Sequence, residues 1–222
     1  MRGESVRGHA RERLLSAGAD LFLEQGIHAV SVDALADEAG VTKRTVYQHF
    51  PGKDALVAQA LEQRGQVWRA WFDAELDRRG ATPEQQVLAM FDVVADEISA
   101  GDYRGCRFVN AAAELPDPAH PARAVASAHK AAVYALIARR VAQLEAPQPE
   151  LLARQLKVLL EGAITTALVD PDPQAARDAR LAAATLLTHA PGEPRAAGSP
   201  PRTARGHEYE DHQEGNGHAR IH

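Results

Sequence analysis

Apolar residues recur every three or four positions through most of the chain, and the runs end at glycine or proline. This spacing places apolar side chains on one face of an α-helix, whereas no segment of useful length alternates as a half-buried β-strand does. The pattern therefore predicts an all-α fold of roughly nine helices. The clearest runs lie at 14–25, 32–39, 43–50, 54–80, 83–100, 106–115, 122–144, 150–169 and 173–190.

The stretch from Ser31 to Lys53 is the most informative part of this pattern. Two short apolar runs are separated by Gly40, which favours a tight turn, and Ser31 and Thr42 each precede one run as a potential N-cap. The stretch therefore predicts a helix-turn-helix, whose second helix can enter the DNA major groove. That second helix carries Lys43, Arg44, Thr45, Tyr47, Gln48 and His49.

The overall charge limits how such a motif could bind DNA. The chain has 222 residues, a formal net charge of −5 and a pI near 6.1. A surface of this kind does not attract nucleic acid indiscriminately. We therefore expect local DNA contacts, made by the second helix of the motif, by Lys53 and by the arginines near the N-terminus.

The run RERLLSAGADLFLEQGIHAVSVDALADEAGVTKRTVYQHFPGKDAL resembles the DNA-binding domain of the TetR family of transcriptional regulators. The resemblance implies an all-helical homodimer that binds a palindromic operator on double-stranded DNA. It also implies that the protein is a repressor, which an unidentified small molecule releases from the operator. Further downstream, GCRFVNAAAELPDPAHPARAVASAHKAA and LLEGAITTALV resemble one branch of the family and name no ligand.

The resemblance assigns two roles to side chains within the motif. Residues at the start of the second helix face base edges or the adjacent backbone, and hydroxyl, imidazole and ammonium groups beyond them hold phosphates. Asp33 departs from the pattern, because some members place a basic residue there, and its only base contact would be to cytosine N4. The predicted DNA-binding residues are Lys43, Arg44 and Thr45 for the bases, Tyr47, His49 and Lys53 for the phosphates, and Ser31, Thr42 and Gln48 beside them.

The breaks between runs predict four segments. Residues 1–8 are expected to form a flexible arm, residues 9–52 the DNA-binding domain, and residues 53–190 a ligand-binding and dimerisation domain. Residues 191–222 are rich in Gly, Pro and charge and poor in large apolar groups, which predicts a disordered tail. The last two helical runs are expected to form an antiparallel pair that meets its copy in a homodimer.

The middle of the chain offers aromatic and aliphatic side chains with a few polar groups among them. A cavity lined in this way would take a small apolar or aromatic molecule, although ordinary core packing is the simpler role for any single residue. The predicted ligand-binding residues are Trp68, Phe72, Phe91, Val94, Phe108, Asn110, His129 and Tyr134.

The composition argues against several other classes of protein. Cys106 is the single cysteine, which excludes an internal disulfide and a multi-cysteine zinc site, and we expect neither a metal nor a cofactor. No apolar run approaches the ~20 residues that span a bilayer, and no signal peptide is evident, so we expect a cytoplasmic protein without membrane contact. Two alternatives stay open: a ligand-independent architectural DNA-binding protein, and an all-helical enzyme, although the common catalytic motifs are absent.

Overall fold

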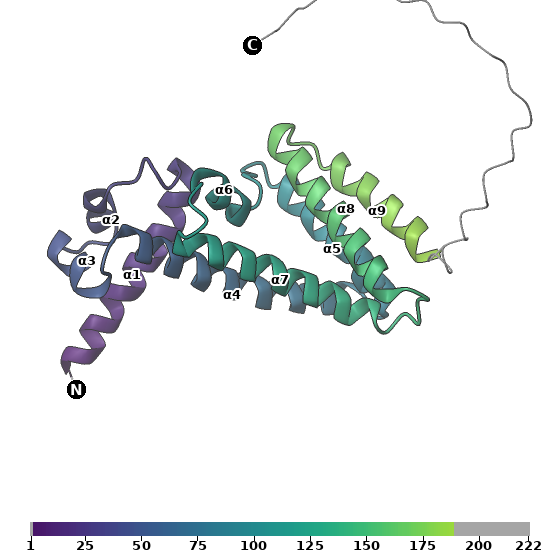
Figure 1. The fold of residues 1–222 in the computed structure, drawn as a ribbon, viewed down its shortest axis with the longest axis horizontal. Coiled ribbons are helices and arrows are strands. Elements are labelled where there is room, and N and C mark those ends of the chain that lie inside the picture. Colours follow the sequence, from purple (N-terminus) through teal and green to yellow (C-terminus); the bar gives the residue numbers. More distant parts are fainter. Residues whose placement is uncertain (1, 189–222) are drawn as a thin grey trace, which may run out of the picture. The chain divides into compact units, whose positions relative to one another are not determined.

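The computed structural model describes residues 2–188, and within this range it contains nine helices and no strand (Figure 1). The prediction of an all-α fold is therefore confirmed. The predicted disordered tail lies outside the described residues. The helices are α1 (Arg2–Gln25), α2 (Val32–Glu38), α3 (Lys43–His49), α4 (Lys53–Arg79), α5 (Pro83–Ser99), α6 (Arg107–Glu114), α7 (Pro121–Val141), α8 (Pro149–Val169) and α9 (Gln174–Thr188).

Two helix ends differ by more than two residues from those that the sequence predicts. α1 begins at Arg2, so the backbone of residues 2–8 is helical where the sequence predicts a flexible arm. This segment contains no proline, and adding turns to a helix that already exists costs far less than starting one. α7 ends at Val141, before Leu144, and the chain then turns through Glu145 at a φ of 52°.

The helix starts follow the capping residues in the sequence. Ser31 Oγ accepts a hydrogen bond from the Ala34 amide at 3.0 Å, which caps α2, and Thr42 Oγ1 accepts one from the Thr45 amide at 3.2 Å, which caps α3. Thr82 and the side chain of the third helical residue form a complete capping box at the start of α5. Each cap satisfies amide groups that have no partner within their own helix.

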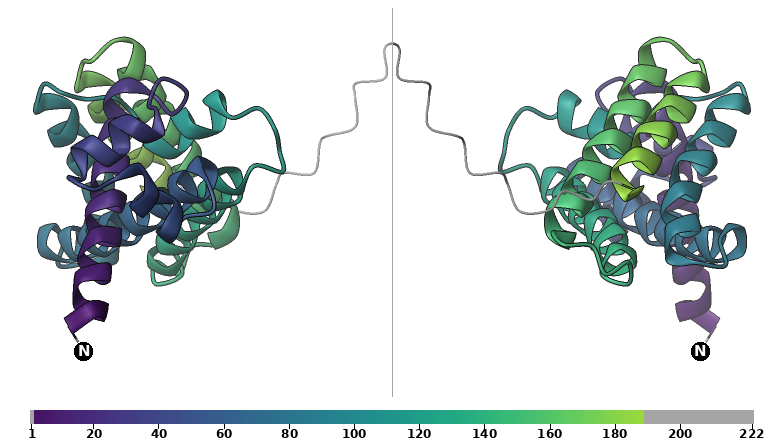
Figure 2. Two further views of the ribbon diagram at one scale, coloured as in Figure 1. Left: turned by 90° about the vertical axis from the view of Figure 1, so that its left-hand side faces the viewer. Right: turned by 90° about the vertical axis from the view of Figure 1, so that its right-hand side faces the viewer.

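The first of two hydrophobic cores joins α1, α2 and α3 to parts of three later helices. Leu14, Leu35 and Leu56 are fully buried in it, and Phe108 of α6 and Ala122 of α7 belong to the same cluster. Figure 2 (left) shows the first three helices, purple to blue, grouped on the side that faces the viewer. The core of the helix-turn-helix is therefore completed by α6 and by the start of α7.

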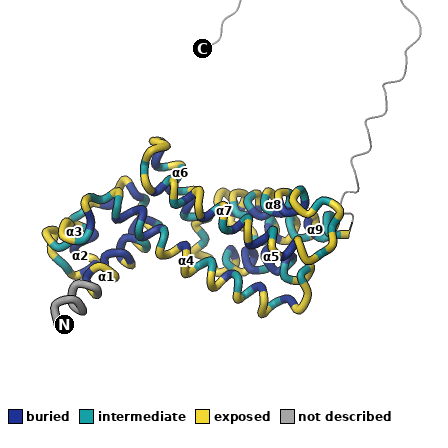
Figure 3. The backbone as a smooth tube through the Cα atoms, turned by 60° about the horizontal axis from the view of Figure 1, so that its bottom comes forward, coloured by how far each residue is buried: buried dark blue, intermediate teal, exposed yellow. Residues whose placement is uncertain are grey.

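The second core lies among α4, α5, α7, α8 and α9, and α4 contributes to both cores. Leu56 and Leu61 of α4 lie in the first core, whereas Phe72 and Leu76 lie in the second. α4 and α7 run side by side, and buried positions follow the inner faces of the helices (Figures 1 and 3). The predicted domain boundary between residues 52 and 53 stays a prediction, because α4 continues through both cores.

A buried arginine joins the end of α4 to α5 and α7. Arg140 is 1% exposed. Its Nη2 donates to Oδ1 of Asp73 at 2.6 Å and to Oδ1 of Asp77 at 2.9 Å, and its Nε donates to Oε1 of Gln86 at 3.1 Å. The neighbouring Arg139 donates to the same Oδ1 of Asp73, also at 2.6 Å. One guanidinium thus holds three helices together beside the second core.

Candidate nucleic-acid interface and ligand cavity

α2 and α3 form the helix-turn-helix that the sequence predicts. The turn between them places Gly40 at a φ of 61°, a conformation that glycine adopts without steric cost. The Gly40 amide donates to Asp37 O at 3.0 Å, and the Val41 amide donates to Ala36 O at 2.9 Å. Val46 then buries α3 against the first core, so the remaining faces of α3 are directed outward.

The predicted DNA-binding residues surround this outward face. Tyr47 is 52% exposed, and Arg44 forms no hydrogen bond or ion pair with residues 9–188. The hydroxyl groups of Ser31 and Thr42 serve as the helix caps, and the Thr45 hydroxyl lies 2.8 Å from that of Thr42. The exposed members are Ser31, Thr42, Lys43, Arg44, Tyr47 and Gln48, and the half-buried members are Thr45, His49 and Lys53.

Lys43 has an acidic partner within the motif, a contact that the sequence did not predict. Its Nζ lies 2.9 Å from Oδ2 of Asp33, the residue that departs from the family pattern. The hydrogen bond from Lys43 to Asp33 and the charge of Asp33 raise the pKa of Lys43. A phosphate or base that binds Lys43 must compete with this carboxylate. Arg44 is the cation of α3 that has no competing partner among residues 9–188.

A cavity of about 300 Å³ lies among α4, α5, α6, α7 and α8, and Leu23 of α1 reaches its wall. Sites for small organic molecules commonly begin at about this volume and are mostly apolar, with a few polar groups. Five of the eight predicted ligand-binding residues line it. These are Trp68, Phe72, Val94, Phe108 and His129.

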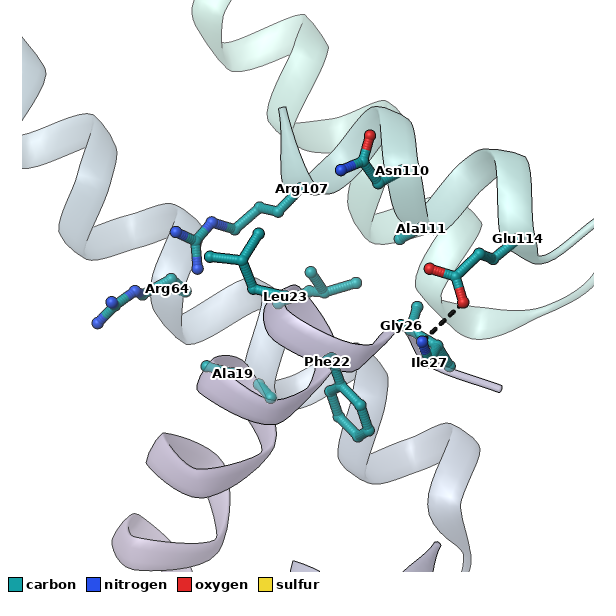
Figure 4. A pocket seen from close by; sticks show the side chains of 12 residues that line it. Ala19, Phe22, Leu23, Gly26, Ile27, Arg64, Arg107, Asn110, Ala111 and Glu114 are labelled. Atoms are coloured by element: carbon teal, nitrogen blue, oxygen red, sulfur yellow. Dashed lines mark hydrogen bonds between the residues drawn. The ribbon is translucent and has the colours of Figure 1, made fainter. Parts of the chain in front are cut away.

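The other three predicted ligand-binding residues lie elsewhere. Phe91 is 1% exposed within the second core, and Tyr134 is a partly buried residue that packs against that core. Asn110 lines a smaller hollow of about 60 Å³ between α1, α4 and α6 (Figure 4), where its Nδ2 donates to Arg104 O at 2.9 Å. Successive residues of a helix are rotated by ~100° about its axis, so helical spacing shows which side chains share a buried face. It does not show whether that face lines a cavity or packs in the core.

Several charged residues of the cavity wall were not among the predicted residues. Lys130 Nζ donates to both carboxylate oxygens of Glu161, at 2.8 and 2.6 Å, and joins α7 to α8. Glu97 accepts from Trp68 Nε1 at 3.3 Å, and burial raises the pKa of this carboxyl. The sequence does carry a signal for Glu97 and Glu161, because each is an acidic residue within an otherwise apolar helical face. A buried acidic group needs a hydrogen-bond or ionic partner, so such a position indicates a polar site between helices.

His129 is a neutral side chain in the cavity wall. Its ring is stacked on Phe108 with 3.6 Å between the ring centroids and 8° between the planes. Burial and the charges of Arg69, Lys130 and Arg107 lower the pKa of His129 to about 3. Arg69 Nη1 lies 3.0 Å from His129 Nδ1 and can only donate, so the proton of the neutral ring resides on Nε2.

Glu114, the last residue of α6, connects the cavity helices to the helix-turn-helix (Figure 4). Its Oε2 accepts from the Ile27 amide at 2.6 Å and from the His28 amide at 3.2 Å, while its carbonyl oxygen lies 2.7 Å from His28 Nε2. Gly26 precedes these amides at a φ of 84°, where a Cβ would lie 3.1 Å from the carboxylate. α6 thus begins at the cavity and ends at the turn between α1 and α2.

Glu114→Ala is expected to lower the free energy of unfolding by about 1–3 kcal/mol, because the buried Ile27 amide loses its acceptor. Urea denaturation measures this loss, and Glu114→Gln, which keeps an acceptor oxygen, should lose less. In native-state hydrogen exchange, the Ile27 and His28 amides should lose protection in the alanine variant. Full protection of both amides in Glu114→Ala would contradict the assigned contact.

Comparison with known proteins identifies the family. Residues 14–60 match the sequence profile described as "Bacterial regulatory proteins, tetR family". The fold is similar to that of a TetR-family transcriptional regulator from Streptomyces coelicolor, with a TM-score of 0.73 and 32% identity, over 82% of this chain and 95% of the other. A TetR transcriptional regulator from Streptomyces avermitilis gives a TM-score of 0.69 and 35% identity, over 79% and 98% of the two chains. The chain belongs to the TetR family.

Membership of the TetR family makes the chain a DNA-binding transcriptional regulator. A further relative is the HTH-type transcriptional regulator YjdC of Escherichia coli (strain K12), which is 28% identical over 160 residues, 72% of this chain and 84% of YjdC. The TetR profile covers α2, α3 and the residues that pack them against α1 and α4. Within residues 2–188, none of the helices combines the length and apolar character that crossing a membrane requires.

Proposed function

We propose that this TetR-family regulator is a repressor that binds a palindromic operator as a homodimer and is released by a small aromatic molecule. The proposal rests on one observation: the same compact unit holds both an outward-facing α3 and a cavity of about 300 Å³. α4 lines the cavity and contributes to both cores, so a change at the cavity reaches the motif through a continuous helix. The contact of Glu114 with the turn between α1 and α2 provides a second connection.

Two cations of the motif have different roles in this proposal. Arg44 is exposed near the start of α3 and has a guanidinium that can donate to guanine O6 and N7. Lys53 is half-buried at the start of α4, where its ammonium suits a phosphate. Arg44 therefore contributes to sequence preference, and Lys53 contributes to affinity for any DNA.

Arg44→Ala is expected to weaken operator binding by about 1–3 kcal/mol and to relax sequence preference. Lys53→Ala should weaken binding to operator and random DNA alike and reduce the salt slope of log K by about one. Fluorescence anisotropy titrations with both duplexes at several salt concentrations measure these effects. Arg78→Ala is the control, because Arg78 is a 68% exposed cation in the last turn of α4. Equal losses on both duplexes for both variants would contradict the division of roles.

The proposed homodimer uses α8 and α9. These helices pack against each other, yet they leave Val158 (70%), Val169 (85%) and Leu181 (64%) exposed. Val158, Gly162, Thr165 and Val169 follow one another at helical spacing along an uncovered face of α8. A second copy of the pair would cover this face and produce a four-helix interface.

The proposed release mechanism is a change in the separation of the two α3 helices of the dimer. Ligand in the cavity would displace α4, and the two motifs would then no longer match successive major grooves. Spin labels on α3 of each subunit measure this separation. An unchanged distance with a ligand that abolishes DNA binding would rule out this mechanism.

Footprinting on the DNA that flanks the gene tests the function as a whole. The expected result is a protected palindrome whose half-sites are separated by about one helical turn or a near multiple. Weak and uniform protection of random sequence would instead favour an architectural DNA-binding protein.

A further inference from the structure

Among the described residues, Arg107 is the one cation of the cavity wall that is half-buried and has no counter-ion in contact. It is the first residue of α6 and lines both the 300 Å³ cavity and the smaller hollow in Figure 4. It forms no ion pair or hydrogen bond with the side chains of residues 9–188, and its Nη1 is buried without a partner. Charged groups in such positions are normally paired.

The surroundings of Arg107 make its charge more costly still. Burial, followed by the nearby positive charge of Arg64, lowers the pKa of Arg107. Figure 4 shows the Arg107 side chain extending past Leu23 toward the side on which Arg64 lies. Arg64 forms an ion pair with Asp20 at 3.6 Å, whereas Arg107 has no such partner among residues 9–188. An anion beside Arg107 would relieve this unfavourable charge.

His129 adds a second donor to the same wall. Because Arg69 occupies Nδ1, the remaining nitrogen of the neutral ring is a donor rather than an acceptor. Three cations, Arg69, Lys130 and Arg107, act on this ring together, which indicates a positive potential around it. A carboxylate is an acceptor that suits this pair of donors.

Three acidic residues, Glu97, Asp102 and Glu161, line the same wall, and none of them forms an ion pair with Arg107 within the described residues. Asp102 is exposed to solvent. Glu161 is already held by both hydrogen bonds from Lys130. Glu97 accepts from Trp68 Nε1 and does not form an ion pair with Arg107, and the pKa of Glu97 is raised by burial in spite of the arginine. The charge of Arg107 is therefore only partly compensated within the wall.

The apolar part of the wall suits a flat molecule. The Trp68 and Phe72 rings are stacked with 4.5 Å between their centroids and 15° between their planes. The ring centroids of His129 and Trp68 are 5.6 Å apart, so the stacked pair of Phe108 and His129 lies next to Trp68. Aromatic pairs of this kind extend readily to a further ring.

We propose that the ligand of this cavity is a small aromatic carboxylate. Its acid group accepts hydrogen bonds from Arg107 and His129, and its ring packs against Trp68 and Phe108. This inference rests on the proposed function, in which the cavity is the ligand site, and it adds the chemical class of the ligand and the residue that selects it.

Matched pairs of acids and amides test the inference on the full-length protein. Benzoate, 3-phenylpropionate and 2-naphthoate are compared with their primary amides by calorimetry and by thermal shift. At least one acid is expected to bind about 10- to 100-fold more tightly than its amide, since hydrogen bonds to a charged group contribute more than neutral ones. Arg107→Met should remove this preference and leave amide binding unchanged, while Arg107→Lys should retain part of it.

Arg104→Met is the matched control, because Arg104 is an exposed cation of the same cavity wall. It should leave the preference for acid over amide within about two-fold of wild type. Circular dichroism establishes that each variant is folded. Amides that bind as tightly as their acids, no binding by any acid, or an equal effect of Arg104→Met and Arg107→Met would overturn the inference.

A separate DNA-binding assay keeps this inference distinct from the proposed function. Operator binding that neutral aromatic molecules release, with no preference for acids, would support the repressor and overturn the carboxylate ligand. Acid binding through Arg107 with no sequence-specific DNA binding would support the ligand class and overturn the proposed repressor.

Discussion

Arg140→Ala is expected to lower the free energy of unfolding by about 3–5 kcal/mol, the largest stability loss that we predict for a single side chain. The substitution removes the hydrogen bonds to Asp73, Asp77 and Gln86 and leaves a cavity where a 1% exposed side chain stood. Urea denaturation measures the loss. Arg140→Met fills most of the volume and should recover part of the stability, which separates the packing contribution from the hydrogen bonds.

The matched control for this prediction is Arg139→Ala. Arg139 donates to the same Oδ1 of Asp73 at the same 2.6 Å, yet 58% of its side chain is exposed. Exposed ion pairs contribute about 0–1 kcal/mol, so the control should lose no more than that. If Arg139→Ala and Arg140→Ala lowered the free energy of unfolding by similar amounts, burial would not explain the stabilisation by Arg140.

The effect of Arg140→Ala should also depend on pH. Burial by itself would raise the pKa of Asp73, but the hydrogen bonds from Arg139 and Arg140 bring it below its ordinary value. A carboxyl with a lowered pKa stabilises the fold above its unfolded pKa of about 4, and this contribution disappears as the pH falls through the folded pKa. The difference in the free energy of unfolding between wild type and Arg140→Ala should therefore decrease as the pH falls from about 5 to about 3.

Val158→Glu is expected to convert the proposed dimer to monomers and to weaken operator binding by about 10²- to 10⁴-fold. Val158 is 70% exposed in one subunit, so a carboxylate there stays hydrated and the fold should be unaffected. In the proposed interface between two copies of α8 and α9, the same carboxylate would be buried without a partner. Each subunit would then bind one half-site alone. Light scattering measures the assembly, and anisotropy measures operator affinity.

Val67→Glu is the control, because Val67 is similarly exposed, at 61%, and lies on α4 rather than on the α8 and α9 pair. The control should remain dimeric and bind operator normally. A dimer that persists in Val158→Glu, or equal dissociation in both variants, would place the interface elsewhere. A wild-type protein that is monomeric at micromolar concentration would contradict the homodimer itself.

The helix-turn-helix was predictable from sequence because its determinants are local. Ser31 and Thr42 cap helices that begin at the next residue, and Gly40 adopts the left-handed conformation that the turn requires. Each of these features depends on hydrogen bonds within a few residues of the chain. The pairing of Lys43 with Asp33 depends on how α2 and α3 cross, and the sequence did not predict it.

The lining of the cavity of about 300 Å³ was only partly predictable. Val94 lines the cavity and Phe91, one turn earlier in α5, is buried in the core, although both belong to the same apolar face. Arg107, Lys130 and Glu161 belong to the cavity wall through contacts between helices that are distant in the sequence. Periodicity shows that a helical face is buried and does not show what covers it.

The sequence by itself determined the helical architecture and the DNA-reading motif, because capping, turn formation and amphipathic spacing act over a few residues. Only the tertiary structure decided which helices share a core, that α4 passes through both cores, and that Glu114 holds the turn between α1 and α2. It also decided that Arg107 has no counter-ion in contact among residues 9–188. These properties arise from side chains brought together across long separations in sequence, where no local spacing rule applies.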